Sequence, residues 1–394
     1  MFRVSTISMF CPGALAGLLF LLACGGEPPA PATLVTDSAG VVVVEGPGTD
    51  VPLGWTAEPV LRLAALDEEG EGFFGASEVE VLGENRIAVL DQTAKRVVLF
   101  DSDGNFLTQY GREGSGPGEF QLPWEMLPMP EGGVAVFDVM NHRLERFDAE
   151  LSPLAPRPFA QVSYFGGHMA YVGSSLVLPT NEPVEEGKHP QALTAMRPGD
   201  TLEVVRYVRN VGGTIILESC GMQLMGIEPI FSPPLLWTEA PEGRAVVVAT
   251  DRYEIDLYRE PEFRLERRIR RNVPVIEATE SMAEASVGDA MRVMTPAGER
   301  VCDAAEVVEK RGFADVVPPI ARVAVSPSGT IWIARWAPKG EDPAIDILTG
   351  EGEYVGTLPP GFPFPDAFLG TDRILRVEKD ALDVASVQGY RVVR

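Results

Sequence analysis

The alternation of apolar and polar residues repeats along the chain at a fixed spacing. Residues 86–101 (RIAVLDQTAKRVVLFD) reappear in altered form as residues 133–148 (GVAVFDVMNHRLERFD), 47 positions later. Each copy has two short apolar runs on either side of a polar turn, a pattern typical of a β-hairpin. This spacing predicts one sheet-forming unit used several times, because a single unit of this kind cannot bury its apolar face alone.

Six such units can be marked out after residue 76, each with about four predicted strands. They cover residues 77–111, 125–158, 161–208, 233–271, 320–358 and 364–394. The pattern predicts an all-β chain folded as a six-bladed β-propeller over residues 34–394. Residues 40–46 and 58–66 are further predicted strands, and we expect one of them to complete the last blade and remove the open edge of the ring.

One segment, residues 278–311, departs from the strand pattern. It is rich in alanine, and Thr279 and Ser281 are candidate N-caps. Its apolar residues include Met282, Ala285, Met291 and Met294. We expect one or two helices inserted between blades four and five. They either pack on the outside of the ring or form a lid over one end of its central channel.

The N-terminus predicts export and lipid attachment. The apolar stretch 13–22 follows a single charge, Arg3, and is too short to span a bilayer, but it is typical of a signal-peptide core. It leads into LLACG (21–25), which resembles a bacterial lipobox. This resemblance implies removal of residues 1–23 and lipidation of Cys24, followed by a flexible tether over 24–33. The alternatives are an ordinary signal with an incidental cysteine and an uncleaved anchor helix.

By resemblance to the sorting rules of bacteria with two membranes, Gly25 after the lipidated cysteine favours the outer membrane. Cys11 is lost with the signal peptide, so Cys220 and Cys302 remain. In an exported protein this pair predicts a disulfide. It would close a loop of roughly 80 residues and contribute on the order of 4 kcal/mol. Two buried free thiols are the alternative, and the spacing matches no zinc motif.

The net charge limits the partners. The chain has 57 acidic and 33 basic residues, a net charge of −24. This excess repels phosphate backbones and argues against nucleic acid as a partner. It favours solubility, with attraction of a cationic partner or Ca²⁺ as the alternative. The densest basic run, 264–271 (RLERRIRR), is expected to pair with neighbouring acids or to face solvent.

Several motifs resemble those of a known family. Residues 141–148 (NHRLERFD) resemble the NHL repeat, and residues 111–120 (GREGSGPGEF) resemble its glycine-rich connection between blades. Residues 37–41 (DSAGV) and 252–255 (RYEI) are similar to segments of six-bladed β-propeller lipoproteins of bacterial envelopes. The resemblance covers nearly all of the mature chain and implies its fold but no particular chemistry. The third unit lacks the Phe-Asp ending, so its limits are the least defined.

The repeated polar residues have a structural explanation. Four aspartates follow strand ends, where carboxylates accept backbone N–H bonds in turns: Asp91, Asp101, Asp138 and Asp148. Glycines between 111 and 118 allow positive φ in a tight crossing between blades, and Phe120 can insert between two sheets. We expect Arg143 to pair with a strand-end acid, with reading of a ligand as the alternative.

No residue can be assigned a catalytic role. The chain lacks a G-x-S-x-G elbow, and the glycines at 114–118 lack the helix and lysine of a phosphate-binding loop. Zinc held by His142, His168 and His189, as in propellers resembling peptidyl-amidating lyases, is an unfavoured alternative. Ca²⁺ held in the channel by oxygen ligands, as in lactonase-like propellers, is another. We expect no bound metal or other cofactor.

We therefore expect an exported, lipid-anchored, non-enzymatic binding or scaffold protein that presents its loops to a protein, peptide or glycan partner. The alternative is a metal-dependent hydrolase or lactonase that works in the channel, which a channel filled by apolar side chains would exclude. Trp124, Trp237 and Trp332 lie near strand ends. There they either pack between blades or line a binding surface.

Overall fold

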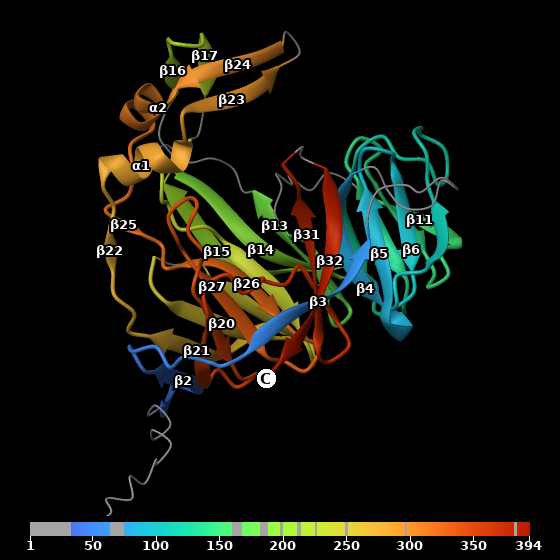
Figure 1. The fold of residues 1–394 in the computed structure, drawn as a ribbon, viewed down its shortest axis with the longest axis horizontal. Helices are drawn as coiled ribbons and strands as arrows, with labels where there is room; N and C mark the ends of the chain where they lie inside the picture. Colours follow the sequence, from blue (N-terminus) through green and yellow to red (C-terminus); the bar gives the residue numbers. More distant parts are fainter. Residues whose placement is uncertain are drawn as a thin grey trace, which may run out of the picture. The chain divides into compact units, whose positions relative to one another are not determined.

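The computed structural model describes residues 33–63, 75–159, 168–181, 188–197, 200–210, 214–224, 227–248, 251–295, 298–381 and 384–394. Six sheets within these residues are the blades of a propeller, as the repeat predicts (Figure 1). Five of them have four strands, and the sheet of blade 4 has six, because two N-terminal strands extend its four blade strands. The first three blades are β4 (Ala76–Leu82), β5 (Arg86–Asp91), β6 (Arg96–Phe100) and β7 (Phe106–Tyr110); β8 (Pro123–Pro128), β9 (Val134–Asp138), β10 (Arg143–Phe147) and β11 (Pro153–Pro158); and β12 (Ala170–Val172), β13 (Ser175–Asn181), β14 (Lys188–Arg197) and β15 (Asp200–Asn210). The other three are β18 (Leu236–Ala240), β19 (Arg244–Val248), β20 (Glu254–Arg259) and β21 (Arg264–Arg271); β26 (Ile320–Val325), β27 (Ile331–Arg335), β28 (Ile345–Leu348) and β29 (Tyr354–Leu358); and β30 (Ala367–Leu369), β31 (Arg373–Lys379), β32 (Ala385–Val393) and β3 (Thr56–Leu63). A short 3-10 helix, η1 (Gly83–Asn85), joins β4 to β5.

Buried apolar side chains hold the blades to one another. Each of six clusters combines two neighbouring blades, and the series runs from blades 1 and 2 through to blades 6 and 1. In the last of these clusters, Val79 and Val89 of blade 1 pack with Leu369 and Leu375 of blade 6. The ring is therefore closed by a continuous apolar core.

The N-terminal strands also hold the ring together. We name residues 41–63 the strap, because they cross the outer edges of three blades. In the strap, β2 (Val41–Gly46) pairs in parallel with β21 of blade 4, Pro52 bridges Thr357 of blade 5, and β3 pairs with β32 of blade 6. Ring closure thus falls within the predicted 58–66 segment, whose last three residues lie outside the described ones. The alternative strand at 40–46 instead widens blade 4, followed outward by β1 (Leu34–Ser38).

The glycine-rich connection between blades 1 and 2 is built as expected. Gly111 has a φ of 117°, and a Cβ there would stand 2.7 Å from the Lys95 carbonyl oxygen. Phe120 is fully buried among residues of blades 1 and 2. The connection therefore combines left-handed turns with an apolar side chain inserted between two sheets.

A second small body, which we name the cap, consists of the described parts of 214–232 and 272–319. It is built from the connections on either side of blade 4. Its elements are β16 (Ile215–Leu217), β17 (Met222–Leu224), β22 (Ile276–Glu277), α1 (Glu280–Val287), β23 (Ala290–Thr295), β24 (Gly298–Asp303), α2 (Ala304–Arg311) and β25 (Val316–Val317). In Figure 1 the helices α1 and α2 lie beside β23, β24, β16 and β17, and α2 contacts β16 and β24.

The expectation of helices throughout 278–311 is wrong in the middle of the segment. Gly288, with a φ of 82°, ends α1, and residues 290–295 then pair antiparallel with residues 298–303. Met291 and Met294 therefore lie on a strand. The N-cap at Thr279 is confirmed, since its hydroxyl accepts the Met282 N–H at 3.3 Å. The cap buries its own apolar clusters, and Phe231 packs edge-on against Trp336 of the blade 5 turn.

Residues 1–32 lie outside the described residues, and with them the predicted signal peptide, Cys24 and nearly all of the tether. In the part of the chain that is described, no helix has the length and hydropathy needed to cross a membrane.

Candidate functional site

The repeated aspartates serve the turns of the blades. Asp101 accepts the N–H groups of Asp103 and Asn105, both at 2.9 Å, and Asp148 does the same for the following turn. Asp91 and Asp138 accept backbone N–H groups at the entrance of the first strand of their blades, and Asp91 also accepts the Ala94 N–H in the turn after β5. The structural interpretation of these four residues is confirmed.

The contacts of Arg143 agree only in part with the prediction that it pairs with a strand-end acid. Its guanidinium donates to the carbonyl oxygens of Ser115, Gly116 and Glu119 in the glycine-rich connection, at 2.6–3.0 Å. Its acidic partner is Glu145, within its own strand, rather than the strand-end Asp138. The reason is that Asn141 already donates to Asp138 at 2.6 Å. Arg143 therefore fixes a blade connection.

The basic run 264–271 pairs with acids, as predicted. Arg268 forms two bonds of 2.7 Å with Asp256, and Arg270 pairs with Glu254 at 2.6 Å. Arg271 is buried against Asp346 of blade 5 at 2.6 Å. The run thus stabilises blade 4 and its junction with blade 5.

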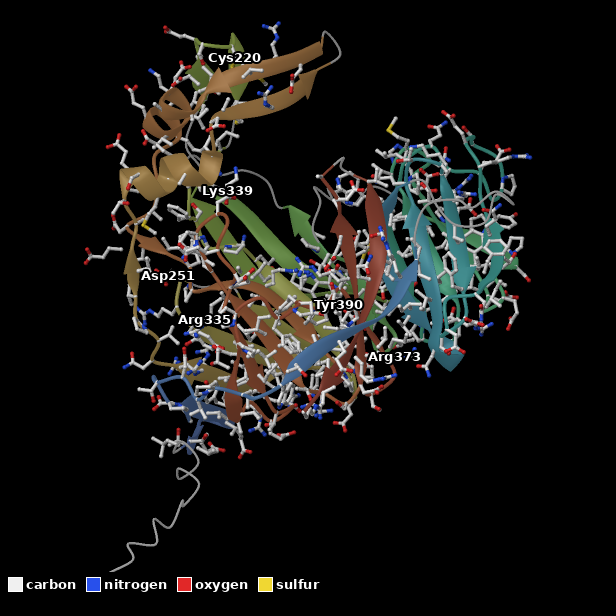
Figure 2. The ribbon with its side chains drawn as sticks, viewed as in Figure 1. Cys220, Asp251, Arg335, Lys339, Arg373 and Tyr390 are labelled. Atoms are coloured by element: carbon white, nitrogen blue, oxygen red, sulfur yellow. A yellow bond between two sulfur atoms is a disulfide. The ribbon has the colours of Figure 1, made fainter. Side chains whose placement is uncertain are left out.

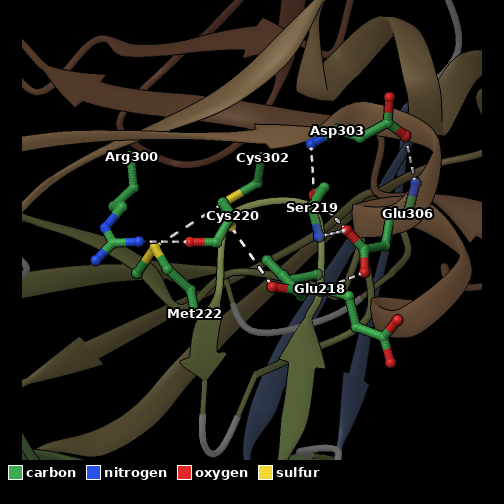
Figure 3. Close-up of a disulfide and its surroundings, with 9 residues drawn as sticks. Glu218, Ser219, Cys220, Met222, Arg300, Cys302, Asp303 and Glu306 are labelled. Carbon is green, nitrogen blue, oxygen red and sulfur yellow. Dashed lines mark hydrogen bonds between the residues drawn. A yellow bond between two sulfur atoms is a disulfide. The ribbon is translucent and has the colours of Figure 1, made fainter.

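The cysteine pair lies in the cap. Cys220 and Cys302 form a disulfide that joins the β16–β17 hairpin to β24 (Figure 3). Around it, the Glu306 carboxylate accepts the N–H groups of Glu218 and Ser219 at 2.6 and 3.0 Å. The disulfide therefore links two chain connections that are 82 residues apart.

Of the three histidines, His142 and His168 lie in separate parts of the structure. His142 is exposed in a turn with a φ of 50°, whereas His168 lies in the central channel. The side chain of His189 is outside the described ones. Trp237 and Trp332 are buried between blades, but Trp124 is 48% exposed. The packing interpretation thus holds for two of the three tryptophans.

The channel is lined by the first strands of the blades, which contact one another around the ring. Three of these strands have a break in their pairing register near their start, and this break determines the direction of the side chain that follows it. After the breaks at 76/78, 123/125 and 320/322 come Glu78, Glu125 and Arg322, at the same position of blades 1, 2 and 5. Bulges of this kind redirect side chains, here into a polar channel.

His168 bridges two of the channel carboxylates. Its ring nitrogens lie 3.0 Å from Glu125 and 3.0 Å from Glu239, so the bridge joins blades 2 and 4 at the entrance of blade 3. Burial alone lowers the pKa of His168, but the two carboxylates outweigh it and hold this pKa well above its usual value. Burial raises the pKa of Glu239, but the contact with His168 more than offsets this effect, so the pKa of Glu239 is below its usual value. The bridge therefore favours the protonated form of His168 and the ionised form of Glu239.

Two further glutamates of the channel have raised pKa values. Burial, followed by the nearby Glu125, raises the pKa of Glu78 to about 8, although its carboxylate also accepts the Met126 N–H at 2.6 Å. Burial and then Glu78 raise the pKa of Glu80 well above its usual value. These pKa shifts follow from crowding several acids in a narrow space with few counter-charges.

A pocket of about 350 Å³ lies in the channel. The acidic and basic side chains around it, which we name the polar ring, are Glu78, Glu80, Glu125, His168, Glu239, Arg322 and Asp366. Arg322, paired with Asp366 at 2.6 Å, lines the pocket, as do Trp237 and Phe364. Within the described residues, no group of three or more His, Cys, Asp or Glu side chains is arranged to hold a metal ion. Among the described residues the pocket is lined by charged and polar side chains together with Trp237 and Phe364, and its glutamates can exchange protons or receive a cation.

Sequence reasoning missed this site. Glu78 and Glu125 are themselves 47 residues apart and follow the repeat offset, which was a usable signal. The contact of His168 with Glu239 carried no such signal, because it joins segments of the chain that have no common spacing.

Comparison with known proteins supports the fold. Residues 72–160 match the model of a family described as "6-bladed beta-propeller". A search of curated proteins finds no match.

Solved structures resemble the chain at low identity. A protein described as exported from Bacteroides fragilis is 13% identical, with a TM-score of 0.46, and the match covers 89% of this chain and 100% of that one. A PQQ-bound aldose sugar dehydrogenase from Streptomyces coelicolor is 11% identical (TM-score 0.42; 86% and 98% covered). A gluconolactonase from Xanthomonas campestris is 10% identical (TM-score 0.37; 86% and 98% covered). At these identities and TM-scores the likenesses carry no conclusion about the activity of this chain.

Proposed function

We propose that this chain is an exported binding protein whose channel receives a cationic side chain of a peptide or protein partner. The observation that carries the proposal is the surplus of acid in the channel. Among the residues that the structure describes, five carboxyl groups belong to the polar ring, against two basic side chains, His168 and Arg322. The acids are Glu78, Glu80, Glu125, Glu239 and Asp366.

The raised pKa values of two glutamates give the proposal its physical basis. Burial and neighbouring acids raise the pKa of Glu78 to about 8 and that of Glu80 above its usual value, because the channel supplies little positive charge. A lysine or arginine side chain would supply that charge, and Glu78 would then release its proton and form a charge-assisted hydrogen bond. The net charge of −24 also attracts cationic ligands over longer distances.

The channel is well suited to binding because its walls are already fixed. Glu78 accepts a backbone N–H of blade 2, and Glu125 accepts the Met169 N–H of blade 3 at 2.8 Å. The indole of Trp237 donates to the His168 carbonyl oxygen at 2.9 Å. Since these contacts tie blades to one another, little ordering is needed when a ligand enters.

A peptide array tests the proposal. The probe is the set of 400 acetylated tetrapeptide amides Ala-X-Z-Ala, with the mature chain labelled for detection. We expect peptides with Lys or Arg to dominate, and the double variant Glu78→Gln/Glu80→Gln to bind them at least tenfold more weakly. Glu262→Gln, an exposed acid in a turn far along the chain, is the matched control. Equal binding of neutral and cationic peptides would refute the proposal.

We also propose that lipidation of Cys24 holds the chain in the bacterial envelope, in the outer membrane. The support is the lipobox-like sequence at 21–25 and the Gly/Pro-rich tether after it. Labelling with a palmitate analogue tests this directly. Cys24→Ala should abolish labelling and leave the precursor unprocessed, whereas Cys11→Ala should change neither, and labelling that persists in Cys24→Ala would contradict the anchor.

A further inference from the structure

Blades 1 and 2 provide an internal comparison, position by position. In blade 1 the Gly75 N–H bonds to Asp91, and in blade 2 the Leu122 N–H bonds to Asp138, 47 residues later. Both first strands break register at the next step. At the residue inside that break, blade 1 has Ser77 and blade 2 has Trp124. In the turn after the second strand, the matching residues are Thr93 and Met140.

The apolar residues of blade 2 are exposed. Trp124 has 48% and Met140 58% of its surface accessible. The fold does not require them, because blade 1 makes the same bonds and the same register break with Ser77 and Thr93. Exposed tryptophan and methionine are instead typical of surfaces that bind other proteins.

Both residues lie at the end of blade 2 where its first strand begins. Ser77, the counterpart of Trp124, lines the channel pocket, and Glu125 directly after Trp124 bonds to His168. The turn that carries Met140 is held to the start of the first strand, since the Val139 N–H donates to the Leu122 carbonyl oxygen at 3.0 Å. The topology thus brings two exposed apolar residues to the end of the blade from which Glu125 reaches the polar ring.

We propose that Trp124 and Met140 form a subsite for an apolar side chain of a peptide partner, next to the subsite for its cationic side chain. This inference rests on the proposed function and deepens it. The charge of the ring selects lysine or arginine, and the neighbouring indole and thioether bind an adjacent aromatic or aliphatic residue. The partner is therefore a protein segment in which a basic and an apolar residue are close together.

The experiment replaces the blade 2 residues by those of blade 1, which this fold already accommodates. Trp124→Ser/Met140→Thr is compared with the wild type on the same Ala-X-Z-Ala array. Peptides that combine Lys or Arg with Phe, Leu or Trp should bind at least tenfold more weakly to the variant, and peptides that combine Lys with Ala should be unaffected. Leu107→Thr, an exposed apolar residue on β7 (46% accessible), is the matched control and should change neither.

The outcomes separate the two proposals. If the wild type prefers cationic peptides and the variant keeps the full preference for apolar neighbours, the subsite is wrong and the channel proposal stands. If cationic peptides are not preferred at all, both fail. Binding of maltohexaose in place of peptides, abolished by Trp124→Ser, would overturn the assignment of a peptide partner.

A second measurement needs no variant. Acrylamide quenching of the wild-type tryptophan fluorescence should fall when the best Lys-Phe peptide is bound, because Trp124 is the tryptophan among the described residues that is largely open to solvent. Quenching that is unchanged at saturating peptide would overturn the subsite.

Discussion

Replacing Arg271 tests how the strap and two blades are joined. Its side chain has no accessible surface, and neither does that of its partner Asp346, 2.6 Å away. The guanidinium also bonds to Asp50 at 3.0 Å and to the carbonyl oxygens of Pro47 and Thr49 in the strap. It lies 3.8 Å from the ring centre of Tyr354.

We expect Arg271→Ala to lower the free energy of unfolding by about 3 kcal/mol. Removing one partner of a buried ion pair costs roughly 3–5 kcal/mol, because the other charge is left without its counter-ion. The lower end applies here, since Arg335 lies 3.7 Å from Asp346 and offsets part of the loss, while Tyr253 and Thr357 still donate to the carboxylate (Figure 2 labels Arg335).

Urea unfolding followed by tryptophan fluorescence measures the effect. Arg270→Ala, on the same strand but 44% exposed in its pair with Glu254, is the control and should cost under about 1 kcal/mol. The double variant Arg271→Leu/Asp346→Leu should recover most of the loss, because neither charge is then left alone. A cost below about 1 kcal/mol for Arg271→Ala, or full additivity in the double variant, would refute the reasoning.

Further predictions concern the channel, the cap and metal content. Because the folded-state pKa of Glu78 is raised from 4.5 to about 8, its contribution to stability is full below pH 4.5 and is lost as the pH rises to about 8. Glu78→Gln should flatten this dependence and be more stable than the wild type above pH 8, by about 2 kcal/mol after screening by channel water; parallel pH profiles would contradict it. Mass mapping of non-reduced peptides should link Cys220 to Cys302, and alkylation of both without reductant would count against the link. Deleting 278–311 alone should destabilise the β16–β17 hairpin, whereas deleting it together with 214–230 should preserve the β-rich circular dichroism spectrum; loss of that spectrum in the larger deletion would show that the cap supports the ring. Elemental analysis of the purified chain should find no stoichiometric Ca or Zn, and one bound Ca²⁺ would instead favour a channel hydrolase.

The blades could be predicted from sequence because their pattern is local. Each hairpin combines apolar runs with turn residues such as Asp101 and Asp148, and the 47-residue offset repeats them. The cap could not be predicted in the same way. Its hairpin at 290–303 is short, and its partner hairpin at 215–224 comes from a different connection. Only the pairing of Cys220 with Cys302, suggested by counting the cysteines, indicated that these two segments meet.

The channel was the least predictable part. Glu125, His168 and Glu239 are acidic or basic residues with no motif around them, and their contact depends on how blades 2, 3 and 4 are set around the axis. Propensity and periodicity describe one blade at a time. The side chains that several blades present to a common centre follow from the ring geometry.

The pairing of β3 with β32 has a consequence for the order in which the chain can fold. Thr56 pairs with Val393, more than 300 residues later in the sequence. Blades 1 to 5 can form from strands that are neighbours in sequence, but β3 must wait for β32. Contacts this distant in sequence slow folding. A variant that lacks β32 would keep an open blade and an unpaired edge, so closure of the ring is a late step that requires both strands.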